Sequence, residues 1–156
     1  MSLLRFLVIV TSSFFFVGYL PFIPGTFGSF AAIVLFCLVW PNSFLYICIV
    51  LVALASGFLV GAKAEKIYAR KDPPCVVIDE VAGMLLALAF LPSYKTEVIV
   101  TAFLLFRLLD TFKPYPADRL QLLGGSLGIM SDDLIAAFYT NFILQAALRL
   151  TVFKGS

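Results

Sequence analysis

The feature that most restricts how this chain can fold is an unbroken run of 19 uncharged residues, Phe44 to Ala62. A helix rises about 1.5 Å per residue, so this run is long enough to cross the hydrocarbon core of a bilayer. The whole chain is 62% hydrophobic and only 13% charged, whereas a soluble domain is about 25% charged. This composition excludes a water-soluble globule and a disordered chain, and it predicts one integral membrane domain over residues 1–156.

Further apolar runs flank this segment, and all of them are expected to be helices. An open β-strand would leave backbone groups unpaired in lipid, and the alternation of a barrel strand is absent. Proline and glycine residues separate the runs. We therefore predict an all-α, polytopic membrane helix bundle with about four to five spanning helices. The expected segments are 29–40, 44–62, 76–91, 98–109 and 134–153, preceded by an N-terminal interfacial or re-entrant helix within residues 3–17.

Basic residues are concentrated in alternate loops between these segments. The expected loop 63–75 carries four of them, and the expected loop 111–133 carries Lys113 and Arg119. The positive-inside rule places both loops on the cytoplasmic face of the membrane. The loop 18–28 falls on the same face if each of the next three runs spans the bilayer.

The absence of histidine limits the chemistry that the chain can perform. It excludes Ser-His-Asp and Cys-His catalysis and every metal site that needs an imidazole. Cys37, Cys48 and Cys75 form no CxxC pair and are expected to act as small hydrophobic residues. A net charge of +2 is too small to predict a nucleic-acid partner, and the sequence leaves the oligomeric state open. Hydrolytic or metal chemistry must therefore use carboxylates, Lys, Arg, hydroxyls and backbone groups.

Two pairs of adjacent acidic residues lie at the cytoplasmic ends of apolar segments. Asp79 and Glu80 precede a stretch of small residues, and Asp132 and Asp133 follow a glycine-rich stretch at 124–131. Ionisable groups cost roughly 2.5–3.5 kcal/mol each to insert into a membrane, so they suggest function. Stabilisation by a helix dipole is the simpler explanation for the first pair, and helix capping for the second. Two adjacent acids in each pair favour the binding of a hard cation.

Cationic and backbone groups accompany the acids on the same expected face. Arg107, Asp110 and Lys113 are spaced three apart on one helical face, and Pro114 ends the helix at Lys113. An internal ion-pair ladder would explain this set equally simply. The sequence PGTFGS at 24–29 is either a turn between membrane segments or an anion site at a helix start. Carboxylates for a divalent metal, beside groups that hold an anion, predict metal-assisted chemistry on a lipid phosphate.

Four short motifs follow one another along the chain. They are PGTFGS at 24–29, DEVAGM at 79–84, RLLDTFKPYP at 107–116 and GGSLGIMSDD at 124–133. In order and spacing the chain resembles the phosphatidylglycerophosphatase A family of bacterial membrane enzymes, from about residue 18 to residue 137. One departure is that Ala136 and Ala137 stand where the family usually has Ala-Gly, which affects helix packing and none of the ionisable residues.

The resemblance implies a Mg²⁺-dependent phosphatase of the bacterial inner membrane, with its active site facing the cytoplasm. Such an enzyme removes the terminal phosphate of phosphatidylglycerophosphate, so the expected partners are this phospholipid and the surrounding membrane lipids. The metal ligands would come from Asp79, Glu80, Asp132 and Asp133. Lys113 and Arg107 would clamp the phosphate, and Asp110 would bind metal, activate a water or attack phosphorus. The expected substrate-binding residues, besides Lys113 and Arg107, are Pro24, Gly25, Thr26, Gly28 and Ser29.

A divalent-cation channel or transporter with an acidic site at the membrane edge is the second hypothesis. It explains the four acids, but it does not explain Lys113 and Arg107 beside them, because bases repel cations. It also predicts acids near the middle of the membrane or on both faces, whereas these acids gather on one face. A third hypothesis is a small structural subunit whose ion pairs fix helix packing, so that substitutions lower stability and change no activity.

Overall fold

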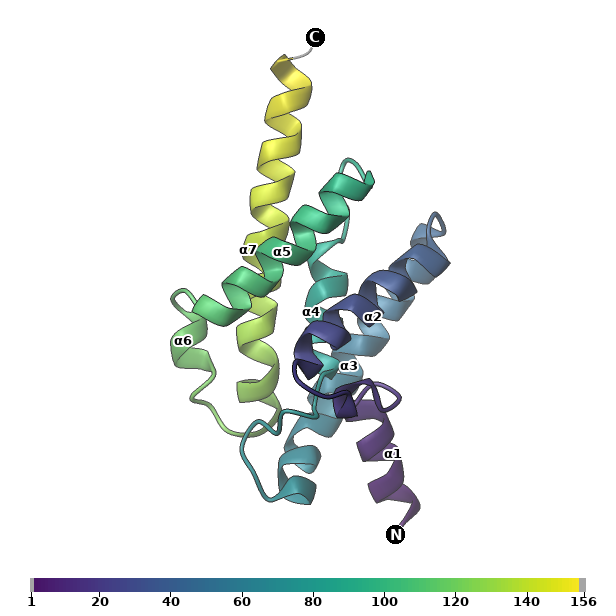
Figure 1. The fold of residues 1–156 in the computed structure, drawn as a ribbon, viewed down its shortest axis with the longest axis vertical. Helices are drawn as coiled ribbons and strands as arrows, with labels where there is room; N and C mark the ends of the chain where they lie inside the picture. The colour runs from purple at the N-terminus through teal and green to yellow at the C-terminus, as the bar shows by residue number, and fades with distance from the viewer. Residues whose placement is uncertain (1, 155–156) are drawn as a thin grey trace.

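The computed structural model describes residues 2–154, which form helices and connecting loops and contain no strand. The two chain ends lie at opposite ends of the long axis (Figure 1). The all-helical prediction is confirmed. The helices are α1 (Leu3–Ser12), α2 (Pro24–Val39), α3 (Ser43–Tyr68), α4 (Ile78–Ala87), α5 (Thr96–Phe112), α6 (Ala117–Leu120) and α7 (Gly125–Lys154), with a short 3₁₀ helix, η1 (Val17–Tyr19), between α1 and α2.

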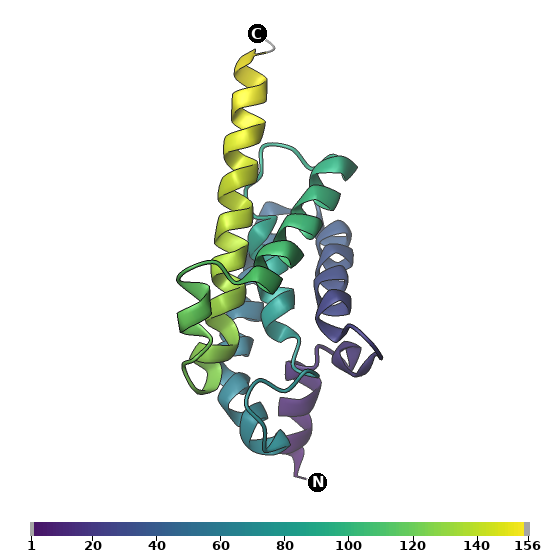
Figure 2. The ribbon, with the colours of Figure 1, turned by 60° about the vertical axis from the view of Figure 1, so that its left-hand side comes forward.

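The short helix α4 forms the centre of the bundle. It packs against α2, α3, α5 and α7, and these helices surround it in both ribbon views (Figure 1 and Figure 2). Gly83 permits this close packing. A Cβ atom at Gly83 would lie 2.9 Å from the ring of Phe106 and 3.2 Å from the carbonyl of Asp133. The small side chains of α4 therefore bring α5 and α7 close to its first turn.

Side chains from neighbouring helices fix the C-terminal end of α4. The side-chain amide of Asn141 donates hydrogen bonds to the carbonyls of Ala87 and Ala89, at 3.0 Å and 2.7 Å. The hydroxyl of Tyr46 donates a hydrogen bond to the carbonyl of Leu85. Carbonyls at a helix end have no partner within the helix, and an apolar environment provides no water to replace one. These bonds allow α4 to end inside the bundle after ten residues.

Two helices are long and apolar enough to cross a membrane by length and composition, namely α3 and the Gly125–Leu150 part of α7. With 16 and 17 residues, α2 and α5 are shorter than the hydrocarbon core, which needs about 20 helical residues. The expected number of four to five spanning helices is therefore not confirmed. The segment 76–91 was expected to span because it is apolar. It contains the ten-residue α4, whose apolar side chains contact protein rather than lipid.

Two helices extend further toward the site than predicted. The expected last segment begins at residue 134, whereas α7 begins at Gly125, whose φ of +68° lies in the left-handed region that glycine tolerates. Asp132 and Asp133 therefore lie inside α7, and the capping explanation for this pair is wrong. In the same way α3 continues past the expected end at Ala62, so Lys63 lies on a helix instead of in a loop.

The N-terminal helix α1 is too short to cross a bilayer, with ten residues where about 20 are needed. It packs against α3, and the carbonyl of Ser12 at its end accepts a 2.9 Å hydrogen bond from the amide of Val77. The first segment of the chain is thus tied to the loop that leads into α4. Its length agrees with the predicted interfacial or re-entrant helix.

Candidate metal and phosphate site

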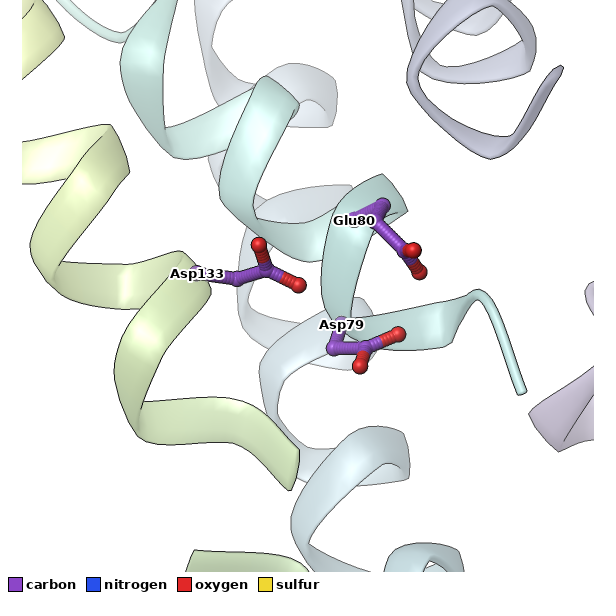
Figure 3. Close-up of side chains that lie close together, drawn as sticks. All are labelled: Asp79, Glu80 and Asp133. Carbon is purple, nitrogen blue, oxygen red and sulfur yellow. The ribbon is translucent and has the colours of Figure 1, made fainter. Parts of the chain in front are cut away.

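Three carboxyl groups meet where the first turn of α4 faces the third turn of α7. One oxygen from each of Asp79, Glu80 and Asp133 lies within 4.8 Å of the other two. Figure 3 shows Asp133 directed from α7 toward the turn of α4 that carries Asp79 and Glu80. The residues Asp79 and Asp133 are only 5% and 3% exposed. We refer to these three residues as the carboxylate cluster.

The carboxylate cluster has the properties of a divalent-cation site. Each of its three residues keeps one buried oxygen that has no hydrogen-bond partner. Buried carboxylates without partners are costly, and their mutual repulsion adds to that cost, so a cation among them is strongly favoured. The donors are all carboxylate oxygens, which hard cations such as Mg²⁺ prefer over nitrogen and sulfur ligands. The residues present therefore fit a metal of this type.

The fourth predicted metal ligand, Asp132, has a different partner. Its carboxylate accepts a hydrogen bond from Nζ of Lys113 and forms an ion pair with it. Lys113 follows the last residue of α5, as Pro114 predicts, in a left-handed conformation with φ of 46°. Burial alone would lower the pKa of Lys113, but the hydrogen bond to Asp132 and other nearby carboxylates raise that pKa above its ordinary value. The ammonium group is therefore charged at neutral pH.

Arg107 and Asp110 form the ion pair that their spacing predicts, with 2.8 Å between Nη1 and Oδ2. The two groups are close but are not aligned for a hydrogen bond, and Nη1 remains a buried donor without an acceptor. Asp110 also interacts electrostatically with Glu80 and Asp133 of the carboxylate cluster. A cation with unused hydrogen-bonding capacity thus lies beside the cluster, where it could bind an anionic group.

The PGTFGS motif forms the first turns of α2, and its backbone lies against the site. A Cβ atom at Gly25 would come within 2.2 Å of Oε1 of Glu80 and 3.3 Å of Nη2 of Arg107. A Cβ atom at Gly28 would lie 3.0 Å from Cβ of Val77. The hydroxyl of Ser29 donates a 3.0 Å hydrogen bond to the carbonyl of Gly25, so its proton is used within the helix. Gly25 of the motif therefore lies beside ionisable groups of the site.

One acid near the site, Asp72, is absent from the residues predicted from the sequence. It lies in the loop between α3 and α4, and its amide donates a 3.2 Å hydrogen bond to Oε1 of Glu65. Desolvation and the neighbouring charge of Asp132 raise the pKa of Asp72, while Lys113 opposes this effect. The sequence signal was weak, since Asp72 is a single acid before two prolines in an ordinary basic loop.

The fold and the site together define a class of helical proteins with membrane-length apolar helices and a buried carboxylate cluster beside two cations. The family model that matches the sequence, Phosphatidylglycerophosphatase A, covers residues 10–148. The chain belongs to this family, as its four motifs predict, and is a phosphatase.

Curated relatives from three bacteria match most of the chain. A phosphatidylglycerophosphatase A of Escherichia coli is 34% identical over 132 residues, which cover 81% of this chain and 75% of the relative. One of Haemophilus influenzae is 35% identical over 128 residues, which cover 79% and 77%. A Bacteroides thetaiotaomicron protein with the provisional name phosphatidylinositol-3-phosphatase is 32% identical over 155 residues, which cover 94% and 96%. No solved structure gives a significant match.

Proposed function

We propose that the chain is a Mg²⁺-dependent phosphatase that releases the terminal phosphate of phosphatidylglycerophosphate and leaves phosphatidylglycerol. The observation that carries the proposal is the buried carboxylate cluster with Arg107 and Lys113 beside it. Membership of the phosphatidylglycerophosphatase A family supports the reaction and the substrate. A cation channel would need no fixed cations beside its acids, whereas a phosphatase uses them to bind its anionic substrate.

We place the site at the cytoplasmic face of the bacterial inner membrane in a multi-pass protein. The support comes from the positive-inside rule, because Lys63, Lys66, Arg70 and Lys71 lie at the end of α3 or just after it. The end of α3 and the start of α7 are joined by Glu65, whose Oε2 accepts a 2.9 Å hydrogen bond from the amide of Gly125. The basic loop and the start of α7, which leads to Asp133, therefore belong to the same face.

In the proposed mechanism the carboxylate cluster, Asp79, Glu80 and Asp133, holds Mg²⁺. The ion, when bound, supplies positive charge that polarises the phosphoryl group. Mg²⁺ usually takes one or two carboxylates besides waters and substrate oxygens, so not all three acids of the cluster would need to contact the ion directly. The three acids come from two helices that Gly83 holds in close contact, which fixes their spacing before substrate binds.

The cations provide the second half of the proposed site. Arg107 and Lys113 bind the phosphoryl oxygens and offset the charge that develops in the transition state. In this proposal Asp132 positions the ammonium of Lys113, which replaces its predicted role as a metal ligand. The start of α2 contacts Glu80 through Gly25, and we propose that this close approach brings the N-terminal end of the helix toward the phosphate.

Of the three roles that the sequence allows for Asp110, we propose the nucleophilic step rather than metal binding. It lies between Arg107 and the carboxylate cluster, so it can orient a water or attack phosphorus itself. The two routes differ in one observable product. Direct attack forms an acyl phosphate on Asp110 that can be trapped, whereas activation of a water leaves the protein unmodified.

Removal of the metal is the first test of the proposal. Purified protein in mixed micelles with phosphatidylglycerophosphate is expected to release phosphate with Mg²⁺ and to lose at least about 100-fold in rate with EDTA. Added Mg²⁺ should restore the rate, because EDTA removes the metal without altering the carboxylate side chains that hold it. Undiminished phosphate release in EDTA would contradict the assignment of the cluster to a metal.

Lys113→Gln is expected to lower kcat/KM for phosphate release by about 100-fold, the usual cost of removing one group that stabilises developing charge. Asp132→Asn keeps the ammonium group of Lys113 but removes the charge that positions it, so we expect a smaller loss of kcat/KM, about tenfold. The double variant should be no slower than Lys113→Gln, because Asp132 acts through Lys113. Lys95→Gln, at the exposed start of α5, is the control and should match the unmodified protein. Additive losses in the double variant would show that Asp132 acts independently.

A second candidate substrate is phosphatidylinositol 3-phosphate. It is favoured by the Bacteroides thetaiotaomicron relative, whose match covers 96% of that protein. Both lipids present a phosphate monoester on a headgroup at the membrane surface, so the carboxylate cluster and the two cations suit either one. A comparison of kcat/KM for the two lipids, in the same micelles with Mg²⁺, decides between them.

A further inference from the structure

The helix α1 and the last turns of α3 line an open surface pocket that is separate from the carboxylate cluster. The two helices pack side by side (Figure 1), and the pocket between them has a volume of about 390 Å³. Three cationic residues line it, Arg5 from α1 and Lys63 and Lys66 from α3. Its remaining wall is mainly apolar and comes from Leu4, Val8 and Ile67.

Within residues 2–154, the cationic side chains of this pocket have no acidic partner. The guanidinium of Arg5 and the ammonium groups of Lys63 and Lys66 form no ion pair and no hydrogen bond there, and the amide of Arg5 donates a hydrogen bond to the hydroxyl of Ser2. Glu65 lies between the two lysines in the sequence, but its carboxylate faces elsewhere and accepts hydrogen bonds from the amides of Asp72 and Gly125. Three like charges on two adjacent helices repel one another, so an anion in the pocket would stabilise their arrangement.

The pocket lies where α3 leaves the apolar part of the membrane. The uncharged run of α3 ends at Ala62, and Lys63 is the next residue, which places the cations at the level of lipid headgroups. On the other side of the pocket, α1 exposes large apolar side chains, with Leu3 and Leu4 73% and 63% exposed. Apolar and cationic side chains therefore lie next to each other at this boundary, where they can contact the acyl chains and the phosphate of a phospholipid.

We propose that this pocket binds the phosphate of an anionic phospholipid, with the first carbons of its acyl chains against Leu4, Val8 and Ile67. Its volume falls within the range of about 300–1,000 Å³ that is usual for ligand pockets. Basic pockets between membrane helices on the cytoplasmic side bind acidic headgroups in this way. Because none of its lining residues belongs to the carboxylate cluster, the pocket holds an accessory lipid rather than the molecule that is hydrolysed.

Lipid binding can be measured without any reaction. Native mass spectrometry of the full chain in detergent, with equimolar phosphatidylserine and phosphatidylcholine of identical acyl chains, should show at least about fivefold preference for phosphatidylserine. Lys63→Gln with Lys66→Gln should reduce this preference to about twofold or less, because the pocket then keeps only Arg5. Phosphatidylserine is neither substrate nor product of the proposed reaction, so failure of that reaction does not affect this measurement.

The matched control is Arg70→Gln with Lys71→Gln. It removes the same charge from the exposed loop directly after α3 but leaves the pocket intact, so the preference should persist. Equal losses in both double variants would contradict a specific pocket and show general attraction to acidic lipid. Inorganic phosphate at the concentration of the lipid should not displace it, because free phosphate gains nothing from the apolar wall. Displacement by phosphate would overturn the assignment to a lipid.

Discussion

Asp133→Asn is expected to slow phosphate release by more than about 100-fold. Mutation of a residue that only hydrogen-bonds to a metal ligand already lowers metal affinity or activity by about 10–100-fold, and loss of a ligand itself should cost more. Asp133 is the one member of the carboxylate cluster on α7, so its loss removes the charge that closes the site opposite α4. The amide has nearly the same volume as the carboxyl group and preserves packing against Gly83. Rates of phosphate release and Mg²⁺ affinity by calorimetry should both fall.

Stability separates this catalytic role from a structural one. Without metal, Asp133 brings a third carboxyl group within 4.8 Å of two others, so its replacement by a neutral amide removes a source of repulsion among them. The metal-free Asp133→Asn protein should therefore unfold at the same temperature as the unmodified protein or at a higher one. A structural subunit held by ion pairs predicts the opposite change. Asp118→Asn, on an exposed surface of α6, is the control and should change neither quantity.

The contacts within one helix were the predictable part of the site. Spacing alone indicated that Arg107 and Asp110 share a helical face, and they form an ion pair at 2.8 Å. Pro114 indicated where α5 ends, and Lys113 follows its last residue. Both inferences depend on interactions within three or four residues, which a sequence specifies directly.

The different partners of the two adjacent aspartates of α7 could not be predicted in this way. The glycine-rich stretch before them suggested a loop, and two acids in a loop could share a ligand. In the structure they lie on a helix, where successive residues differ by about 100° in direction. Asp133 therefore faces α4, while Asp132 faces Lys113. The choice of partner depends on how the helices pack, which the sequence pattern does not contain.

The predicted count of spanning helices was not confirmed, for a related reason. Hydropathy measures how apolar a segment is, but it does not show whether that segment is surrounded by lipid or by other parts of the protein. The side chains Val81, Met84 and Leu85 of α4 are completely buried against other helices. A ten-residue helix can remain in such an environment because Asn141 and Tyr46 satisfy its final carbonyls. That compensation comes from residues 39 or more positions away in the chain from the carbonyls they bond.

Gly25→Ala is expected to lower phosphate release by about 100-fold, since misplacement of a reactive group by about 1 Å can cost that much. The added methyl group would lie 2.2 Å from Oε1 of Glu80, so the carboxylate must move out of the carboxylate cluster. The displaced atom is the end of a flexible side chain, so it can move without shifting the backbone. Alanine is also more favourable than glycine within a helix, by up to about 1 kcal/mol. The variant should therefore fold normally while Mg²⁺ affinity and phosphate release both fall.

Two comparisons establish that the effect of Gly25→Ala passes through Glu80. Gly124→Ala is the matched control, because a Cβ atom there would have no other heavy atom within 4 Å, and its rate should be unchanged. Glu80→Gln with Gly25→Ala should be no slower than Glu80→Gln alone, since the methyl group then displaces a side chain that has already lost its charge. A double variant much slower than Glu80→Gln would mean that Gly25 contributes through the backbone of α2, by contact between its first turn and the phosphate, rather than by leaving space for the carboxylate.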